Sequence, residues 1–326
     1  MKVCIYGAGA IGGWIGARLA QAGHAVSAVA RGATLEALRR HGLQLASPDG
    51  DVQAAVQAHE DPAALGVQDL VIIAVKAPAL PAVAARIAPL LGPRTVVLTA
   101  MNGVPWWFFL SGGFGGPLAG AALDSVDPGG AIALSIPVRH VVGGVVHAAC
   151  AIDGPGRIRH VQGRKVIVGE PAGGESERVL AISAVLTQAG LEAPVSSQIQ
   201  KDAWYKLWGN MTMNPISALT GVTMDRILDD DLVRGLVTAV MLEARAVGER
   251  IGVPIAERPE DRHAVTRRLG AVKTSMLQDV EAGRPVELDA LVAAVREIGQ
   301  RVGVATPFTD ALLGLARLKA RGLGLY

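Results

Sequence analysis

The chain has 326 residues, 50% of them hydrophobic, and a formal net charge of +2 at pH 7; this length allows two domains, and the charge argues against nucleic-acid binding. The mean hydropathy is +0.36, but charged residues interrupt each long apolar stretch, so no membrane partner is expected. Two cysteines, Cys4 and Cys150, cannot form a disulfide framework, and the N-terminus lacks the segments of a signal peptide, so we predict a cytoplasmic protein.

The chain opens with a short apolar strand, a glycine loop and the start of a helix. Gly7 permits a tight turn, Gly9 lets a pyrophosphate approach the backbone, and Gly12 allows close packing of helix on strand. The N–H groups at the helix N-terminus would then bind the anion. An ordinary strand-to-helix turn can show the same glycines, but the context on both sides favours a dinucleotide site. Its predicted residues are Gly7, Ala8, Gly9, Ala10, Ile11 and Gly12.

The end of the second predicted strand, Ala25–Ala30, bears on the type of dinucleotide. NAD sites usually place Asp or Glu there to bond the ribose 2′-hydroxyl, whereas this chain has Arg31, which can pair with a 2′-phosphate. Lys76 follows the next buried strand, Leu70–Val75, and either reaches the same phosphate or keeps its ammonium in solvent. The sequence therefore predicts NADP(H) as the cofactor.

The first half alternates β-branched runs with Ala- and Leu-rich helical runs, which is typical of a parallel sheet buried on both faces. A Gly- and Glu-rich segment at 170–175 marks the predicted boundary. We expect a dinucleotide-binding domain over 1–172, with a Rossmann-type doubly wound α/β sheet, and an all-helical substrate and dimerisation domain over 173–326. Such a pair places its active site in a cleft. The strands expected to finish the sheet are Gly143–Ala151, Gly156–His160 and Lys165–Val168.

Helix signals dominate the second half of the chain. Ser196 and Ser197 are candidates to cap a helix that runs to about Thr212. The acidic run at 229–231 places negative charge at the start of another helix, where the helix dipole favours it. Thr306 followed by Pro307 predicts the start of the last helix.

Candidate chemistry begins with an amide and a lysine. Asn102 follows the strand Thr95–Thr99, at the sheet edge where nicotinamide and substrate would meet, although Asn-Gly is also a common turn pair. Lys206, Asn210 and Asn214 are spaced by four, so they line one stripe of an otherwise apolar helix. Such a stripe faces water, a partner or a ligand, unless the lysine stem is simply packed and its ammonium snorkels.

Two further segments carry polar residues at possible helix starts. Ser275 lies in the segment 273–279, and Glu287 precedes Asp289 just before an apolar-periodic helix. Capping and compensation of the helix dipole explain Asp289 well, and spacing alone does not separate Glu287 from that explanation.

Together these motifs resemble the ketopantoate reductase (2-dehydropantoate 2-reductase) family, which reduces a 2-keto acid with NADPH. The resemblance runs from the glycine loop through Asn102-Gly103, the lysine–asparagine stripe ending at Pro215, and Glu287-Leu-Asp289. It implies that Lys206 is the general acid and that Glu287 orients the substrate, with no metal. It further implies that Asn210, Asn214 and Ser275 bind substrate, that Asn102 lies between cofactor and substrate, and that Arg31 and Lys76 bind the 2′-phosphate.

Two departures from that family concern the substrate. Many members carry an acidic residue shortly after Asn-Gly, where this chain has Val104-Pro-Trp-Trp-Phe-Phe109, and many carry a second Asn-Gly where this chain has Val292-Ala293. We expect a more apolar cleft, in which the four aromatics 106–109 either wall the substrate or pack in the core. The expected product is pantoate or a close analogue. A β-hydroxyacid or opine-type dehydrogenase, and a non-catalytic NADPH sensor, remain as alternatives.

Overall fold

The computed structural model describes all 326 residues and divides into two compact units. The first, the sheet unit, comprises Met1–Met101 and Gly130–Ile199, and the second, the helical unit, comprises Asn102–Gly129 and Gln200–Tyr326. This division falls after Ile199, later than the expected boundary at residue 172, because the strand β10 (Val195–Ser196) still pairs with the sheet. No helix has both the length and the apolar character that a membrane span requires.

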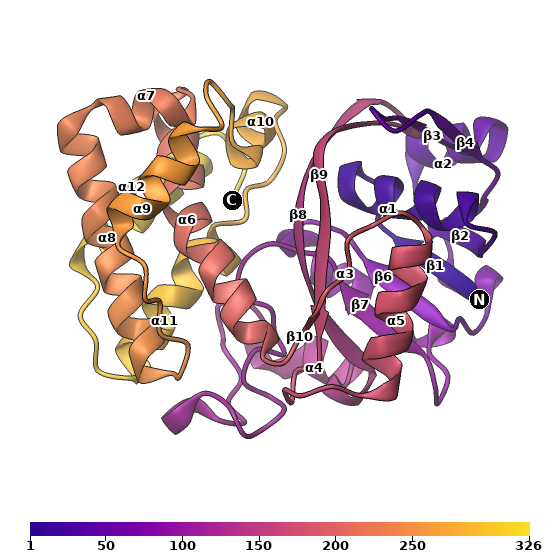
Figure 1. The fold of residues 1–326 in the computed structure, drawn as a ribbon, viewed down its shortest axis with the longest axis horizontal. Coiled ribbons are helices and arrows are strands. Elements are labelled where there is room, and N and C mark those ends of the chain that lie inside the picture. The colour runs from indigo at the N-terminus through magenta and orange to yellow at the C-terminus, as the bar shows by residue number, and fades with distance from the viewer. The chain divides into compact units, whose positions relative to one another are not determined.

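One ten-stranded sheet forms the centre of the sheet unit (Figure 1). Its order is β4-β3-β9-β8-β7-β6-β1-β2-β5, with β10 beside β9. All pairs are parallel except β3 with β4 and β8 with β9. The remaining strands are β1 (Lys2–Tyr6), β2 (Ala25–Val29), β3 (Leu43–Ala46), β4 (Val52–Ala54), β5 (Gln57–His59), β6 (Leu70–Ile73), β7 (Val96–Thr99), β8 (Val141–Gly154) and β9 (Arg157–Gly169).

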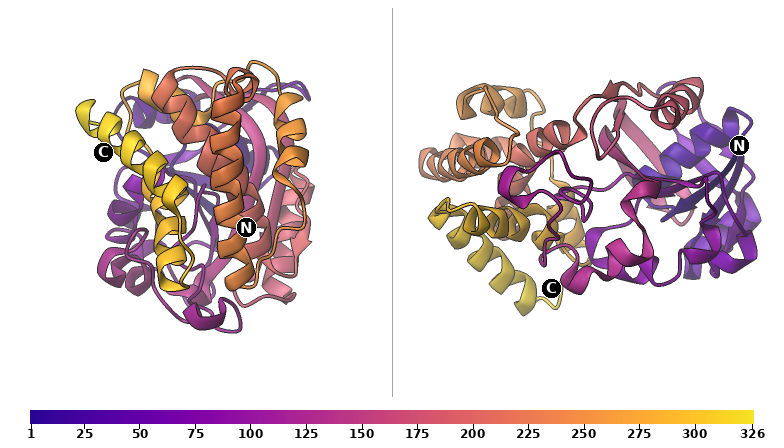
Figure 2. Two further views of the ribbon diagram at one scale, coloured as in Figure 1. Left: turned by 90° about the vertical axis from the view of Figure 1, so that its left-hand side faces the viewer. Right: turned by 90° about the horizontal axis from the view of Figure 1, so that it is seen from below.

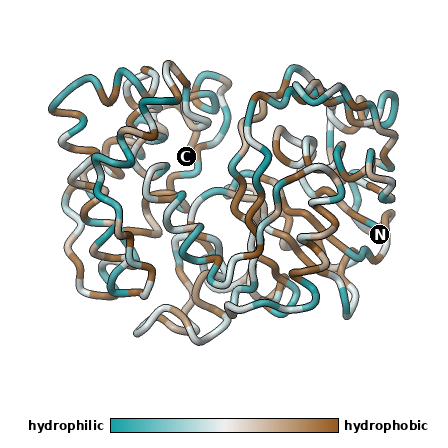
Figure 3. Tube along the Cα trace, viewed as in Figure 1, coloured by the Kyte–Doolittle hydropathy of each residue, from teal (hydrophilic) through white to brown (hydrophobic).

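The central strands confirm the predicted fold class. Every residue of β6 and β7 is buried, as is every residue of β1 after the first, and the trace there is hydrophobic (Figure 3). β1 has β2 on one side and β6 on the other, so the direction in which strands are added reverses at β1. Ligands of doubly wound sheets bind outside the carboxyl ends of the strands at such a reversal.

Five α-helices accompany the sheet. Two glycines let the first helix approach the strands closely. An added Cβ at Gly13 would lie 2.5 Å from Ile158 Cδ1, and one at Gly16 would lie 2.9 Å from Ile5 Cγ1. The first helix can therefore lie directly on the strands. The helices are α1 (Ala10–Gln21), α2 (Gly32–His41), α3 (Leu80–Ala84), α4 (Ala131–Ser135) and α5 (Glu177–Gln188).

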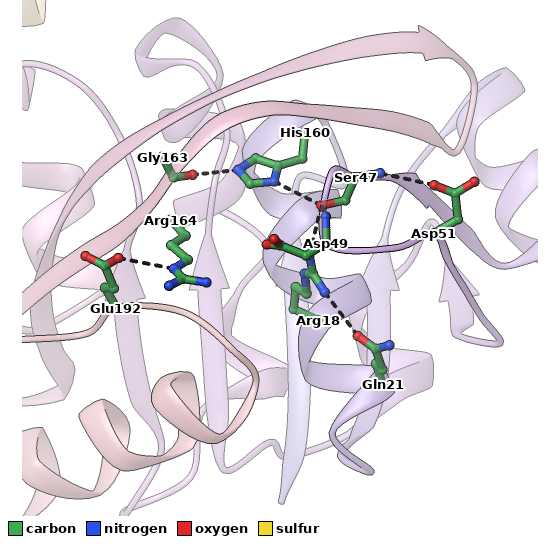
Figure 4. Close-up of polar contacts among 9 residues, drawn as sticks. All are labelled: Arg18, Gln21, Ser47, Asp49, Asp51, His160, Gly163, Arg164 and Glu192. Atoms are coloured by element: carbon green, nitrogen blue, oxygen red, sulfur yellow. Dashed lines mark hydrogen bonds and ion pairs between the residues drawn. The ribbon is translucent and has the colours of Figure 1, made fainter.

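The two short strands expected at 156–160 and 165–168 are instead one strand, β9, that forms a long hairpin with β8 (Figure 1). Irregular pairing within the hairpin lets the strand continue through the intervening polar residues. A polar network ties the hairpin to the rest of the sheet unit (Figure 4). His160 Nδ1 lies 3.1 Å from Ser47 Oγ, which also accepts a hydrogen bond from Arg18 at 2.9 Å.

The helical unit contains most of the second half of the chain. α6 begins at Ile199, close to the predicted serines, and continues past Pro215 to Thr220. The last helix starts at Pro307, as predicted. Its neighbour α8 lies beside it (Figure 2), and Glu243 accepts hydrogen bonds there from the backbone N–H groups of Phe308 at 2.9 Å and Thr309 at 2.8 Å. The helices after α6 are α7 (Met224–Asp229), α8 (Asp231–Arg250), α9 (Pro259–Arg267), α10 (Ser275–Glu281), α11 (Ala294–Arg301) and α12 (Pro307–Gly322).

Candidate active site

A cavity of about 290 Å³ that is open to solvent lies in the sheet unit. It opens at the carboxyl ends of β1, β2 and β6, where the reversal of strand order places a ligand site. The lining from these three ends is Tyr6–Gly9, Val29–Arg31 and Val75. The β8–β9 hairpin and the α3 region supply the opposite walls.

The glycine loop at the floor of this cavity fits a dinucleotide phosphate. Gly7 has φ +101, and a Cβ there would lie 2.6 Å from Val75 Cγ1. A Cβ at Gly12 would lie 2.1 Å from the Gly7 carbonyl oxygen, so this position also requires glycine. At Gly9 an added Cβ would meet nothing within 4 Å, and Gly9 is the N-cap of α1 with no side-chain cap. The loop thus leaves space at a helix N-terminus, where an anion is stabilised.

Three guanidinium groups and one carboxylate line the cavity. Arg31 contributes from the end of β2, as the sequence predicts. Arg86, Arg157 and Glu60 were not predicted, because each comes from a different element that only folding brings to this place. Lys76 follows β6 as the N-cap of a short turn and is not among the residues that line the cavity.

The charged groups around this cavity affect the pKa of the Tyr6 hydroxyl. Burial raises the pKa of this hydroxyl, and the charges of Cys4 and Asp61 add to that rise, while the guanidinium groups of Arg86 and Arg31 oppose it. Positive charge of this kind suits a phosphorylated ligand.

A second group of predicted residues meets within the helical unit. Lys206 Nζ, on α6, donates a hydrogen bond to Asn102 Oδ1 at 2.8 Å. Burial lowers the pKa of Lys206 from 10.5 to about 8, and the charge of Glu287 opposes that shift. Glu287 is only 4% exposed. The site therefore combines a lysine of lowered pKa, an amide oxygen that accepts its hydrogen bond, and a buried carboxylate that favours its charged form.

The loop of Asn102 is held in place by its neighbour Gly103. Gly103 has φ +86, and an added Cβ would lie 2.6 Å from the Ala290 carbonyl oxygen. The same oxygen accepts a hydrogen bond from Val104 N at 2.8 Å. Ala290 belongs to a π-helical turn, Asp289–Ala293, directly after Glu287. π-Turns are frequent at functional sites, and this one connects the Asn102 loop to the segment that carries Glu287.

Replacement of Gly103 by alanine tests this packing. We expect a lowered melting temperature and weaker substrate binding at the Lys206 site, because the new Cβ would face a backbone oxygen. The left-handed φ costs a non-glycine residue about 1–2 kcal/mol by itself. Gly112→Ala is the matched control: its φ is +69, but nothing lies within 4 Å of its added Cβ. Equal melting temperatures for the two variants, measured by calorimetry, would show that the contact with Ala290 is unimportant.

The remaining predicted substrate residues occupy distinct places. Asn214 is 6% exposed and Asn210 is half-buried, and both lie on α6 beyond Lys206. Ser275 is the exposed first residue of α10, whose N-cap is Thr274. Their roles in substrate binding stay predictions. Asp289 lies in the first turn of a helical segment, as expected for compensation of the helix dipole, but the N-cap is Leu288. Asp289 Oδ1 accepts a hydrogen bond from the Tyr326 hydroxyl at 2.6 Å.

The aromatic run after Asn102 divides into two pairs. Phe108 and Phe109 meet edge to face with ring centroids 4.9 Å apart, and both belong to the core of the helical unit. Of the two alternatives left open for the aromatic run, hydrophobic burial favours packing in the core for this pair. Trp106 and Trp107 are each 2% exposed, and the indole N–H of Trp106 has no hydrogen-bond partner. Their part in substrate selection stays a prediction.

Family models match both parts of the chain. The model described as "Ketopantoate reductase PanE/ApbA" matches residues 3–107, and its C-terminal counterpart matches residues 198–320. A 2-dehydropantoate 2-reductase from Mesorhizobium japonicum is 49% identical over 100% of both chains. This chain belongs to the ketopantoate reductase family. The resemblance stated from the motifs is thereby confirmed.

Solved structures agree with this membership. A structure from Ralstonia solanacearum shares 60% identity with a TM-score of 0.95, covering 99% of each chain. The 2-dehydropantoate 2-reductase of Geobacter metallireducens shares 28% identity with a TM-score of 0.86, covering 98% of this chain and 100% of its own. The ketopantoate reductase fold thus extends over both units of this chain.

Proposed function

We propose that this ketopantoate reductase family member reduces a 2-keto acid to a 2-hydroxy acid with NADPH, the substrate being 2-dehydropantoate or a close analogue. The observation that carries the proposal is the hydrogen bond from Lys206 to Asn102, with buried Glu287 acting on the same ammonium. NADPH, when bound, supplies the hydride. The glycine-loop cavity with Arg31 supports its binding in the sheet unit.

Lys206 performs the proton chemistry of this reaction. Reduction of a ketone builds negative charge on the carbonyl oxygen, and a protonated lysine stabilises that charge and delivers the proton. A pKa of about 8 keeps Lys206 mostly protonated at neutral pH yet able to release its proton. Asn102 orients the ammonium through its amide oxygen, and Glu287 favours the charged form. Asn210, Asn214 and Ser275 bind the polar groups of the substrate.

A screen of substrate classes tests the proposed function. NADPH absorbance is followed with a panel of 2-keto acids that includes 2-dehydropantoate, with amine–keto acid pairs, and in reverse with 3-hydroxy acids and NADP⁺. We expect turnover with 2-keto acids alone. Turnover that requires an amine would indicate an opine-type dehydrogenase, oxidation of 3-hydroxy acids a β-hydroxyacid dehydrogenase, and NADPH binding without any turnover a sensor.

The pH dependence of kcat/KM reports the protonation state of Lys206. Because Lys206 donates a proton and has a pKa of about 8, the rate of keto acid reduction is expected to be level below pH 8 and to fall about tenfold per pH unit above it. Oxidation of the hydroxy acid needs the neutral amine, so its rate should instead rise with pH up to that value. A reduction rate that stays level to pH 10 would rule out this role.

We also propose that the chain forms a homodimer through the helical unit. Phe308, Leu315 and Leu318 on α12 are 49%, 61% and 70% exposed, and their spacing places them along one face of the helix. A row of exposed apolar side chains is typical of an interaction surface. A family relative from Staphylococcus aureus, which shares 20% identity, is itself described as dimeric.

Mass measurement by light scattering checks the dimer. The double variant Leu315→Glu, Leu318→Glu should convert a dimer into a monomer, because four carboxylates would then be buried in the interface. Leu134→Glu, at an 84% exposed leucine of the sheet unit, is the matched control and should not change the mass. A wild-type protein that is monomeric at micromolar concentration would contradict this proposal.

A further inference from the structure

We propose that Arg157, at the start of β9, binds a phosphate group of the dinucleotide. This inference rests on the proposed NADPH-dependent function, and it adds a residue from the β8–β9 hairpin to a site otherwise built at the strand ends. Arg157 lines the same cavity as the glycine loop and Arg31. The hairpin would thus take part in cofactor binding.

The position of the Arg157 side chain depends on a glycine. Gly154 pairs with Arg157 across the hairpin and also lines the cavity. A Cβ at Gly154 would lie 2.9 Å from Arg157 Nη2 and 3.1 Å from its Nε, so the guanidinium lies directly against the Gly154 backbone. Gly154 has no left-handed φ that would demand glycine. Its missing side chain therefore serves to make room for the guanidinium at the cavity wall.

Arg157 has no ion pair with a carboxylate, unlike several other arginines of the sheet unit. Arg86 lies 3.8 Å from Asp61, Arg159 lies 3.0 Å from Asp153, and Arg164 lies 3.1 Å from Glu192. Arg157 and Arg31 have no such ion pair, and both face the cavity. An unpaired guanidinium in a cavity that the N-terminus of α1 also lines is suited to a phosphate, which its planar donors can bind with two hydrogen bonds.

Strand pairing fixes the backbone at Arg157, whose side chain is exposed. On one side Arg157 pairs with Gln44 of β3, in the register that also pairs Ile158 with Leu45. Three residues further on, His160 contacts Ser47 Oγ, lies 2.5 Å from the Gly163 carbonyl oxygen (Figure 4) and stacks on Trp14 with ring centroids 5.3 Å apart. The segment of β9 that carries Arg157 is therefore anchored to the rest of the sheet unit.

Titration of the protein with NADPH tests the proposal without a measurement of turnover. NADPH binding is followed by fluorescence for the wild type and for Arg157→Gln. We expect an affinity about ten- to a hundredfold weaker in the variant, the usual effect of losing a charge-assisted phosphate contact. Arg159→Gln is the matched control, because Arg159 is two residues along the same strand but is paired with Asp153; its affinity should stay at the wild-type value.

Two simpler ligands show which phosphate of NADPH Arg157 binds. ADP carries only the diphosphate, and adenosine 2′-monophosphate carries only the 2′-phosphate. A loss confined to ADP assigns Arg157 to the diphosphate, and a loss confined to the 2′-monophosphate assigns it to the group that distinguishes NADPH. Unchanged binding of NADPH and of both ligands overturns the inference. If the wild type itself fails to bind NADPH, it is the proposed function that fails.

Gly154→Ala provides a second variant that keeps the charge. Its Cβ should displace the guanidinium from the wall, so NADPH affinity should fall several-fold while the melting temperature changes little. If Arg157→Gln weakens binding but Gly154→Ala does not, the guanidinium acts from a different position, and the inferred placement is wrong.

Discussion

Replacement of Lys206 by alanine is expected to lower kcat for 2-keto acid reduction by about 10²–10⁴-fold. In the proposed mechanism the ammonium acts when negative charge develops on the substrate oxygen, so its loss should affect the transition state more than the ground state. The cofactor cavity lies in the sheet unit, whereas Lys206 belongs to the helical unit. NADPH affinity should therefore remain near the wild-type value.

Steady-state kinetics together with an NADPH titration measure both parts of this prediction. Lys201→Ala is the control, because Lys201 is an exposed lysine on the same helix α6. It should leave kcat unchanged. If the Lys206→Ala enzyme keeps most of its kcat, Lys206 is a buried structural lysine and the proposed acid is another group.

Replacement of Arg31 by aspartate should change cofactor preference. The variant removes the guanidinium at the end of β2 and adds a carboxylate that would repel a 2′-phosphate. An ion-paired phosphate contact contributes about 1.5–3 kcal/mol, or roughly ten- to a hundredfold in affinity. NADPH binding should weaken by at least that factor, whereas NADH binding should change much less.

Fluorescence titration with both cofactors measures the selectivity. Arg40→Asp makes the same substitution on α2 at a side chain that is 71% exposed and paired with Glu36, and it should affect neither cofactor. Equal losses of NADPH and NADH affinity in Arg31→Asp would assign Arg31 to a part that the two cofactors share.

Local sequence features predicted much of the sheet unit correctly. Continuous apolar runs indicated β1, β2, β6 and β7 because parallel strands buried on both faces need apolar side chains on every position. The glycine loop was equally predictable, since the positive φ of Gly7 and the close contact of Gly12 with the Gly7 carbonyl oxygen arise within one short segment. The hairpin was not predicted as continuous, because polar residues in the middle of β9 resemble a turn until their pairing with β8 is known.

The sequence by itself determined that a lysine and two asparagines lie along one stripe of a helix, because spacing along a helix is a local property. Only the tertiary structure decided which distant residues meet. It joined Lys206 to Asn102 across 104 positions of sequence, and it placed Phe108 and Phe109 in the core. It also placed Arg157 and the glycine loop along one cavity, since strand pairing and burial over the whole chain, and no local pattern, determine where a hairpin lies.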